Sequence, residues 1–97
     1  MFLFLIQEAK FPLGQIVATP GALRALEECG QRPEEFINRH AQGDWGELGA
    51  EDIEANERAL KDDARLLSRY TTSSKEALYV ITEWDRSVTT ILLPEEY

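Results

Sequence analysis

The sequence predicts an α+β fold that has one or more N-terminal strands, about three helices and a C-terminal antiparallel three-stranded meander. Two observations carry this prediction. Apolar residues recur at helical spacing between positions 19 and 62, and after position 64 they alternate as they do in strands. The 97 residues suit a single domain, since domains most often contain ~100–150 residues. The helices are therefore expected to cover one face of the sheet.

The N-terminal region opens on an apolar run, Met1–Ile6, which polar or charged side chains at positions 7, 8 and 10 end. A membrane-spanning helix needs ~20 apolar residues, and the basic start of a signal peptide is missing. We expect a short buried strand within residues 1–10. A further strand is expected over residues 11–18, with Pro12 at its beginning because proline cannot donate to a sheet ladder.

Three helices are expected next. The first begins at Pro20, with Thr19 as its N-cap, and Gly30 ends it. The second begins at Pro33 and ends at Gly43. Its residues Phe36, Ile37 and His40 have helical spacing and are expected to share a face.

The third helix is expected to run from Asp52 to about Lys61, with Ile53 and Leu60 pointing inward. It should stop at Asp62 and Asp63, because carboxylates are unfavourable at the negative end of a helix dipole. Three strands then follow, over residues 65–72, 77–84 and 88–93, which are rich in β-branched and aromatic residues. Short polar loops between them give the antiparallel meander.

The composition narrows the classes of function. The chain carries 18 Asp and Glu against 10 Lys and Arg, a formal net charge of −8. Direct nucleic-acid binding is disfavoured, because contacts with phosphate groups need clustered Lys and Arg side chains. Cys29 is the only cysteine and cannot form an internal disulfide, which favours a cytoplasmic location. No membrane association is expected.

The negative charge is concentrated in residues 44–63. This segment has eight acids and two bases, a net charge of −6, whereas residues 1–43 and 64–97 each have five acids and four bases, a net charge of −1. The segment suits a solvated helix face, an interaction surface that attracts a basic partner, or a divalent-cation site. Its spacing does not match an EF-hand loop. If it is an interaction surface, the residues expected to bind the partner are Asp44, Glu47, Glu51, Asp52, Glu54 and Asp62.

The segment from His40 to Glu47 combines an imidazole, two carboxylates and an indole. It suits a structural turn, in which Asp44 accepts backbone N–H bonds and Trp45 fills the core. The alternative is a small enzyme in which His40 is the acid or base, Asp44 or Glu47 orients it, and Tyr70 lies nearby. One histidine and one cysteine do not make a zinc site, and the sequence has no phosphate-binding loop, so no metal or cofactor is expected.

Three segments, residues 14–22, 40–46 and 65–70 with 82–97, together resemble a group of small, uncharacterised bacterial proteins found on plasmids and other mobile elements. The resemblance covers residues 11–97 and leaves out the apolar N-terminus. Some members are labelled restriction–modification subunits, but 97 residues cannot hold a methyltransferase domain. The resemblance implies a setting of mobile DNA, in which small acidic proteins often counter host defences.

Together these observations predict a small acidic protein without catalytic activity that binds a basic surface of another protein. An inhibitor or nucleic-acid mimic directed at a host defence or nucleic-acid-processing protein is the expected type. The alternatives are the His40 enzyme and an antitoxin-like or self-associating structural protein. The sequence leaves the oligomeric state open.

Overall fold

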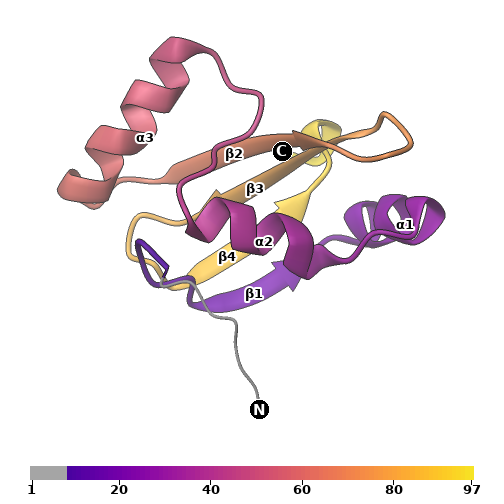
Figure 1. The fold of residues 1–97 in the computed structure, drawn as a ribbon. Coiled ribbons are helices and arrows are strands. Elements are labelled where there is room, and N and C mark those ends of the chain that lie inside the picture. Colours follow the sequence, from indigo (N-terminus) through magenta and orange to yellow (C-terminus); the bar gives the residue numbers. More distant parts are fainter. Residues whose placement is uncertain (1–8) are drawn as a thin grey trace.

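The fold is α+β, and the computed structural model describes residues 9–97 (Figure 1). The strand expected among the first six residues lies outside the described part of the chain. The elements in chain order are β1 (Gln15–Ala18), α1 (Pro20–Cys29), α2 (Pro33–Ala41), α3 (Ala50–Asp62), β2 (Leu66–Thr71), β3 (Ala77–Thr82), β4 (Val88–Leu92) and a short 3-10 helix, η1 (Pro94–Glu96).

The strands form one four-stranded mixed sheet in the order β1-β4-β3-β2. β2, β3 and β4 pair antiparallel, and β1 adds to β4 in parallel, with Gln15 opposite Val88. The three C-terminal strands pair antiparallel as predicted, but they do not form a sheet by themselves: the N-terminal strand joins them, and the sheet is mixed and four-stranded. Alternation in a sequence identifies strand residues, but it does not identify the edge that a distant strand joins. Only residues 15–18 of the expected strand 11–18 are extended in the sheet.

Both ends of α1 and the start of α2 agree with the predicted signals, whereas α2 ends at Ala41, before Gly43, and α3 begins at Ala50, two residues before Asp52. The Thr19 hydroxyl accepts a hydrogen bond from the Ala22 amide at 3.1 Å, and Gly30 closes α1 with a φ of 74°. α2 begins at Pro33. α3 ends at Asp62, and Asp63 adopts the left-handed conformation at its C-cap.

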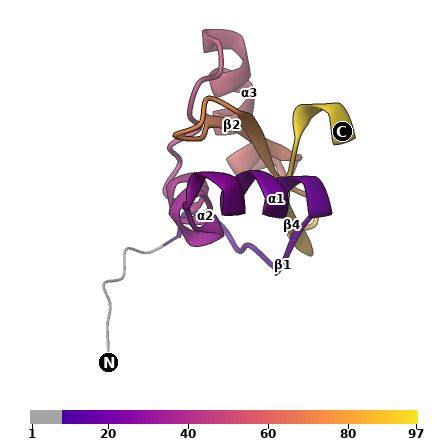
Figure 2. The same ribbon diagram turned by 90° about the vertical axis from the view of Figure 1, so that its right-hand side faces the viewer.

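The main core lies between the sheet and helices α1 and α2. Alternate side chains of β2, β3 and β4 point toward these helices and are buried, and Figure 2 shows α2 and η1 on opposite sides of the sheet. The cluster contains Ala22, Ala25, Leu26, Phe36, Ile37, Tyr70, Leu78, Val80, Ile91 and Leu93. A second cluster of Phe11, Trp45, Ala59 and Leu66 lies beneath α3.

The outer edge of β2 is covered by two parts of the chain. Asn56 of α3 donates from Nδ2 to the Leu67 carbonyl at 2.6 Å and accepts from the Leu67 amide at 3.1 Å. Further along, the Arg69 amide donates to the Trp45 carbonyl and the Arg69 carbonyl accepts from the Glu47 amide. Strand edges with free backbone groups promote aggregation, and here the outward groups of Leu67 and Arg69 are paired. Asn56 and Ala59 face inward in α3, whereas Ile53, expected to point inward, is exposed.

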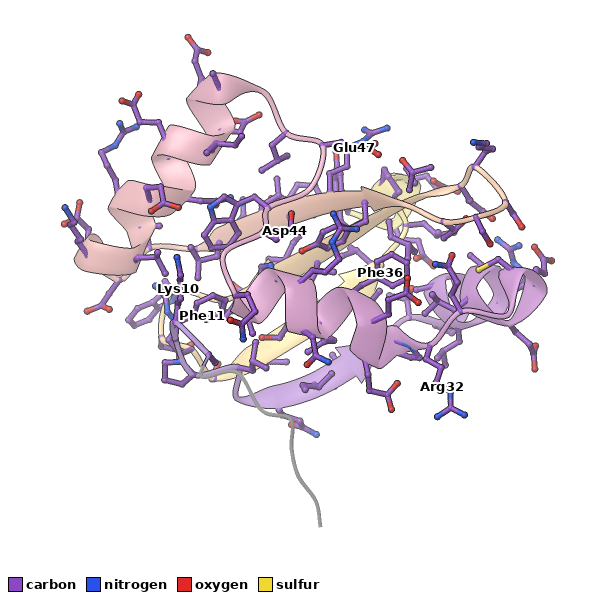
Figure 3. The ribbon with its side chains drawn as sticks, viewed as in Figure 1. Lys10, Phe11, Arg32, Phe36, Asp44 and Glu47 are labelled. Atoms are coloured by element: carbon purple, nitrogen blue, oxygen red, sulfur yellow. The ribbon has the colours of Figure 1, made fainter. Side chains whose placement is uncertain are left out.

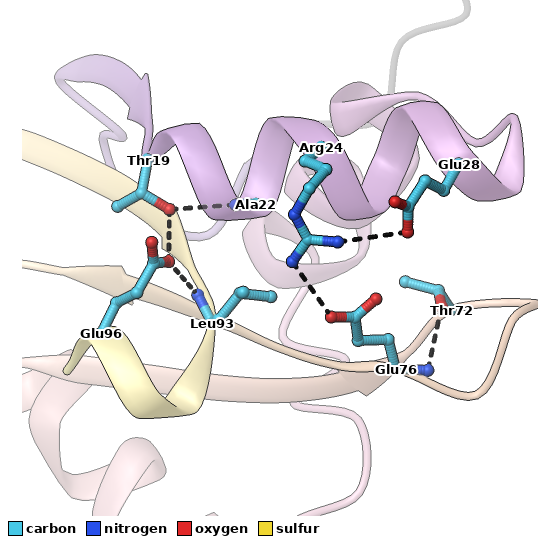
Figure 4. Close-up of polar contacts among 8 residues, drawn as sticks. All are labelled: Thr19, Ala22, Arg24, Glu28, Thr72, Glu76, Leu93 and Glu96. Carbon is cyan, nitrogen blue, oxygen red and sulfur yellow. Dashed lines mark hydrogen bonds and ion pairs between the residues drawn. The ribbon is translucent and has the colours of Figure 1, made fainter.

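The C-terminal turn is tied to the start of α1 (Figure 4). The Thr19 hydroxyl donates to Glu96 Oε1 at 2.5 Å, and the Leu93 amide donates to the same oxygen at 2.8 Å. Nearby, Arg24 of α1 pairs with Glu28 and Glu76. Among residues 9–97, no helix has the length and apolar character that crossing a membrane requires.

Candidate functional site

The His40 side chain lies on α2 at the centre of a buried polar chain. Its ring is fully buried, with Nδ1 2.6 Å from the Ser68 hydroxyl of β2 and Nε2 2.9 Å from the Thr82 hydroxyl of β3. Thr82 in turn lies 2.7 Å from the Thr89 hydroxyl, which donates to the carbonyl of Leu13 at 2.7 Å. One helix, three strands and the segment before β1 are therefore joined by side-chain hydrogen bonds.

The direction of these bonds assigns the histidine tautomer. A carbonyl can only accept, so the single Thr89 proton goes to Leu13, and Thr89 must accept from the Thr82 hydroxyl. Thr82 has then used its own proton and accepts from Nε2–H of His40. Nδ1 of His40 accepts from Ser68. Each of the three hydroxyls and both ring nitrogens of His40 therefore have a hydrogen-bond partner, as buried polar groups require.

The surroundings of His40 favour the neutral ring. The imidazole meets Phe11 and Trp45 edge to face, at centroid distances of 5.2 and 5.7 Å. Burial, together with the nearby positive charge of Arg86, lowers the pKa of His40 from 6.5 to about 4. At neutral pH the imidazole is uncharged, and its hydrogen bonds are made within the protein.

The expected acid–base arrangement of His40 with a carboxylate is not formed. Asp44 instead pairs with Arg39, whose Nε lies 2.7 Å from Oδ2, and this bond lowers the pKa of the Asp44 carboxyl. The Tyr70 hydroxyl donates to the backbone carbonyl of Asp44 at 2.6 Å, and burial raises the pKa of Tyr70 to about 12. Glu47 accepts from the Thr71 hydroxyl at 2.7 Å. These contacts are typical of a structural turn.

Trp45 anchors the turn between α2 and α3, as expected. Its indole is buried, and Nε1 donates to Glu57 of α3 at 2.9 Å. Gly46 follows with a φ of 77°, and a Cβ there would lie 1.9 Å from the Arg69 carbonyl oxygen. The close approach of the turn to β2 therefore requires glycine. Asp44 Oδ1 accepts from the Gly46 amide at 3.1 Å, which is the backbone bond expected of it.

The structure divides the six predicted partner-binding residues into two groups. Asp44 and Glu47 lie in the turn between α2 and α3, where Figure 3 labels them, and both have contacts within the protein. The other four, Glu51, Asp52, Glu54 and Asp62, lie on α3 and are exposed. Positions 51, 54 and 62 fall on one stripe of a helix with 3.6 residues per turn. We call Glu51, Glu54 and Asp62 the α3 acidic stripe.

The α3 acidic stripe is only partly neutralised. Arg58 lies on the same side of the helix and pairs with Glu54 at 3.4 Å, and both side chains are largely exposed. Such a pair contributes only ~0.3–0.5 kcal/mol. Among the ion pairs of residues 9–97, none involves Glu51, Asp52 or Asp62. Helix α3 has five acids and two bases, a net charge of −3.

Two groups of structurally important residues were missed by the sequence analysis. Asn56 has no role in the sequence analysis, although Ile53, Asn56 and Leu60 have the i, i+3, i+7 spacing of residues on one helix face. The hydroxyls of Ser68, Thr82 and Thr89 also have no role in the sequence analysis, although all three are buried. No local pattern shows that β2 and β3 bring the Ser68 and Thr82 hydroxyls to one imidazole, or that Thr89 of β4 bonds to Thr82. In the described part of the chain, no group of three His, Cys, Asp or Glu side chains is placed to hold a metal ion.

Comparison of the chain with protein-family models, curated proteins and solved structures found no match. The resemblance to plasmid and mobile-element proteins therefore stays an expectation.

Proposed function

We propose that the protein acts without catalysis, by presenting the α3 acidic stripe to a basic surface of a protein partner. The observation that carries the proposal is the charge distribution on α3: Glu51 and Asp62 are exposed and make no ion pair among the described residues. Clustered carboxylates raise the rate of association with a basic surface and exclude acidic competitors.

The way α3 is attached supports this role. One side of the helix is held by two of its residues: Asn56 bonds to the backbone of β2, and Glu57 accepts from the Trp45 indole. The opposite side is left to solvent. Figure 1 shows α3 beyond the β2 edge, apart from α1 and α2. A helix fixed in this way presents its side chains without prior ordering, which lowers the entropic cost of binding.

Two grounds support the kind of partner we propose: the net charge of the chain and its resemblance to proteins of mobile elements. A net charge of −8 disfavours direct contact between this chain and nucleic acid. The same charge is complementary to a partner protein whose basic surface binds nucleic acid. The resemblance to mobile-element proteins adds host defence and nucleic-acid-processing proteins as candidates. An inhibitor or nucleic-acid mimic is the function we propose.

A matched pair of charge-reversal variants tests the proposal. Glu51→Lys/Glu54→Lys/Asp62→Lys changes the stripe, and Glu27→Lys/Glu34→Lys/Glu95→Lys changes three exposed acids elsewhere. Each set takes the formal net charge from −8 to −2, since three reversals add six units. The immobilised proteins are incubated with a bacterial lysate, and the captured proteins are quantified.

We expect the unmodified protein and the second variant to capture the same basic protein, and the stripe variant to lose it. Capture should also weaken at ~0.5 M salt, where the Debye length falls to a few Å. Equal capture by both variants, capture that does not respond to salt, or the absence of any captured protein would contradict the proposal.

A further inference from the structure

Trp84 is an exposed aromatic residue in the turn between β3 and β4. Its side chain is 63% exposed, the largest fraction among the large apolar side chains of residues 9–97. Three arginines of this part of the chain lie over aromatic rings, and those rings are Phe11, Tyr70 and Tyr97. Within the same part of the chain no ring contact involves the Trp84 indole, which is therefore available to a partner.

The turn that carries Trp84 is held in one conformation by Arg86. The Arg86 amide donates to the Glu83 carbonyl at 2.9 Å, and its backbone has a φ of 60°, a conformation that glycine adopts at less cost. The Arg86 guanidinium compensates by donating to the carbonyls of Glu83 and Trp84, at 3.2 and 3.3 Å. Asp85 accepts from the amide and the hydroxyl of Ser87. A turn fixed in this way presents its aromatic side chain without prior ordering, which lowers the entropic cost of binding.

Arg86 also ties this turn to the end of α3. Its guanidinium donates to the Ala64 carbonyl at 2.6 Å and to the Ala59 carbonyl at 2.9 Å. The nitrogen that binds the Ala64 carbonyl, Nη1, is also the one that binds the Trp84 carbonyl. Figure 1 shows the loop between β3 and β4 on the same side of the molecule as the C-terminal end of α3. Trp84 and Asp62, the last member of the α3 acidic stripe, therefore lie at the same end of the molecule.

The charges beside the indole favour a cationic ligand. Glu83 and Asp85 flank Trp84 in the sequence, and none of the ion pairs of residues 9–97 involves either carboxylate. A guanidinium that stacks on an indole gains a cation–π attraction, which is stronger for arginine than for the more strongly hydrated ammonium of lysine. The two carboxylates add a Coulomb attraction to the same ligand. An apolar side chain of a partner gains neither.

We propose that Trp84 anchors the basic partner by stacking on one of its arginine side chains. The inference rests on the proposed function and adds to it the residue that holds the partner and the side chain that is held. Tryptophan is enriched among the few interface residues that carry most of the binding energy. Exposed charges mainly change the rate of association, and a desolvated contact mainly changes the rate of dissociation. The α3 acidic stripe therefore attracts the partner, and Trp84 retains it.

An NMR titration of the full chain with octa-arginine tests the proposal, and octa-lysine is the comparison of equal charge. The chain has two indole N–H groups, and that of Trp45, which is buried and bonded to Glu57, is the internal reference. We expect the Trp84 indole resonance to shift to saturation with octa-arginine while that of Trp45 stays in place. Octa-arginine should bind about two- to fivefold more tightly than octa-lysine, and Trp84→Ala should abolish this difference. Leu23→Ala, at an apolar residue of α1 that is 51% exposed, is the matched control and should keep it.

The outcomes separate this inference from the proposed function. An unshifted Trp84 resonance, equal binding of the two peptides to the unmodified protein, or a preference for arginine that survives Trp84→Ala or is lost in Leu23→Ala overturns the role of Trp84. The variant Glu51→Lys/Glu54→Lys/Asp62→Lys, titrated in the same way, reports on the α3 acidic stripe. If this variant binds octa-arginine as tightly as the unmodified protein, the proposed function and the inference both fail. If it binds less tightly while Trp84→Ala keeps the preference for arginine, the inference alone fails.

Discussion

At the scale of single residues, His40 is a structural histidine that specifies how α2 meets the sheet. In the neutral ring one nitrogen donates and the other accepts. Both are satisfied when Nδ1 accepts from Ser68 and Nε2–H donates to Thr82. An apolar residue of similar size would remove the acceptor of the Ser68 hydroxyl and the donor to the Thr82 hydroxyl, at a cost of ~1–3 kcal/mol for a buried group left unsatisfied. The chain of hydroxyls thus contributes to a unique packing of the core.

The burial of His40 predicts a loss of stability in mild acid. The unfolded chain binds a proton near pH 6.5, whereas folded His40 has a pKa of about 4. As the pH falls through this window, the unfolded state takes up the proton first, and the free energy of unfolding decreases by about 3 kcal/mol in all. Urea unfolding at about pH 7 and about pH 5 measures the upper part of this loss, above the range in which ordinary carboxyls titrate.

Two observations check this prediction independently. The His40 imidazole is the only one in the chain, so its NMR titration is unambiguous and should give a midpoint far below 6.5. The variant His40→Gln, which retains one donor and one acceptor, should show a smaller decrease in stability between the two pH values. A midpoint near 6.5 would contradict the buried, neutral assignment.

At the scale of secondary-structure elements, α3 is connected to the sheet by side-chain bonds more than by apolar contact. Its buried residues are Asn56 and Ala59, and the Asn56 amide acts as a substitute for one residue of a neighbouring strand. The same residue therefore closes the β2 edge and fixes the helix that carries the α3 acidic stripe.

Replacing Asn56 by alanine is expected to lower the free energy of unfolding by about 1–3 kcal/mol, because the Leu67 amide and carbonyl lose their partners. Asn38→Ala is the matched control, since Asn38 is a helical asparagine that is exposed, and it should change stability by less than ~0.5 kcal/mol. Urea unfolding measures both. Equal losses in the two variants would show that Asn56 does not join α3 to the sheet.

The helices and strands could be predicted because their signals are local. Thr19 and Pro20 begin α1, as the capping argument requires, and α3 ends at Asp62, one residue beyond the predicted Lys61. The same is true of Trp45, because an aromatic residue between two glycines in a turn suits an anchor.

Relations between distant segments could not be predicted in the same way. The place of β1 beside β4 depends on the packing of both helices, and no property of residues 15–18 encodes it. The partners of His40 come from two strands, β2 and β3, and Thr89 of β4 bonds to one of them; alternation places these hydroxyls on one face of the sheet but not opposite one ring. For Asp44, the sequence suggested a catalytic or a structural role, and the neighbouring Arg39 decides between them.

At the scale of the whole molecule, Glu96 bonds to Thr19, which lies 77 positions before it in sequence. It accepts from the Thr19 hydroxyl at the start of α1 and from the amide of Leu93, the residue between β4 and η1. Tyr97 follows it and meets the Tyr79 ring of β3 edge to face at 5.9 Å. The hydrogen bond from Thr19 is the main reason that the pKa of Glu96 is lowered.

The depressed pKa of Glu96 predicts that this connection is present above the ordinary carboxyl pKa and is lost as the pH falls through the folded value. Glu96→Ala should remove it at neutral pH: the Leu93 amide should exchange faster, and the Tyr97 ring resonances should move toward those of a free tyrosine. Glu95→Ala is the matched control, because Glu95 is the adjacent exposed acid in η1. NMR measures both properties in both variants. If Glu95→Ala has the same effect as Glu96→Ala, the general charge of the C-terminal turn holds it in place, and the bonds to Thr19 and Leu93 do not.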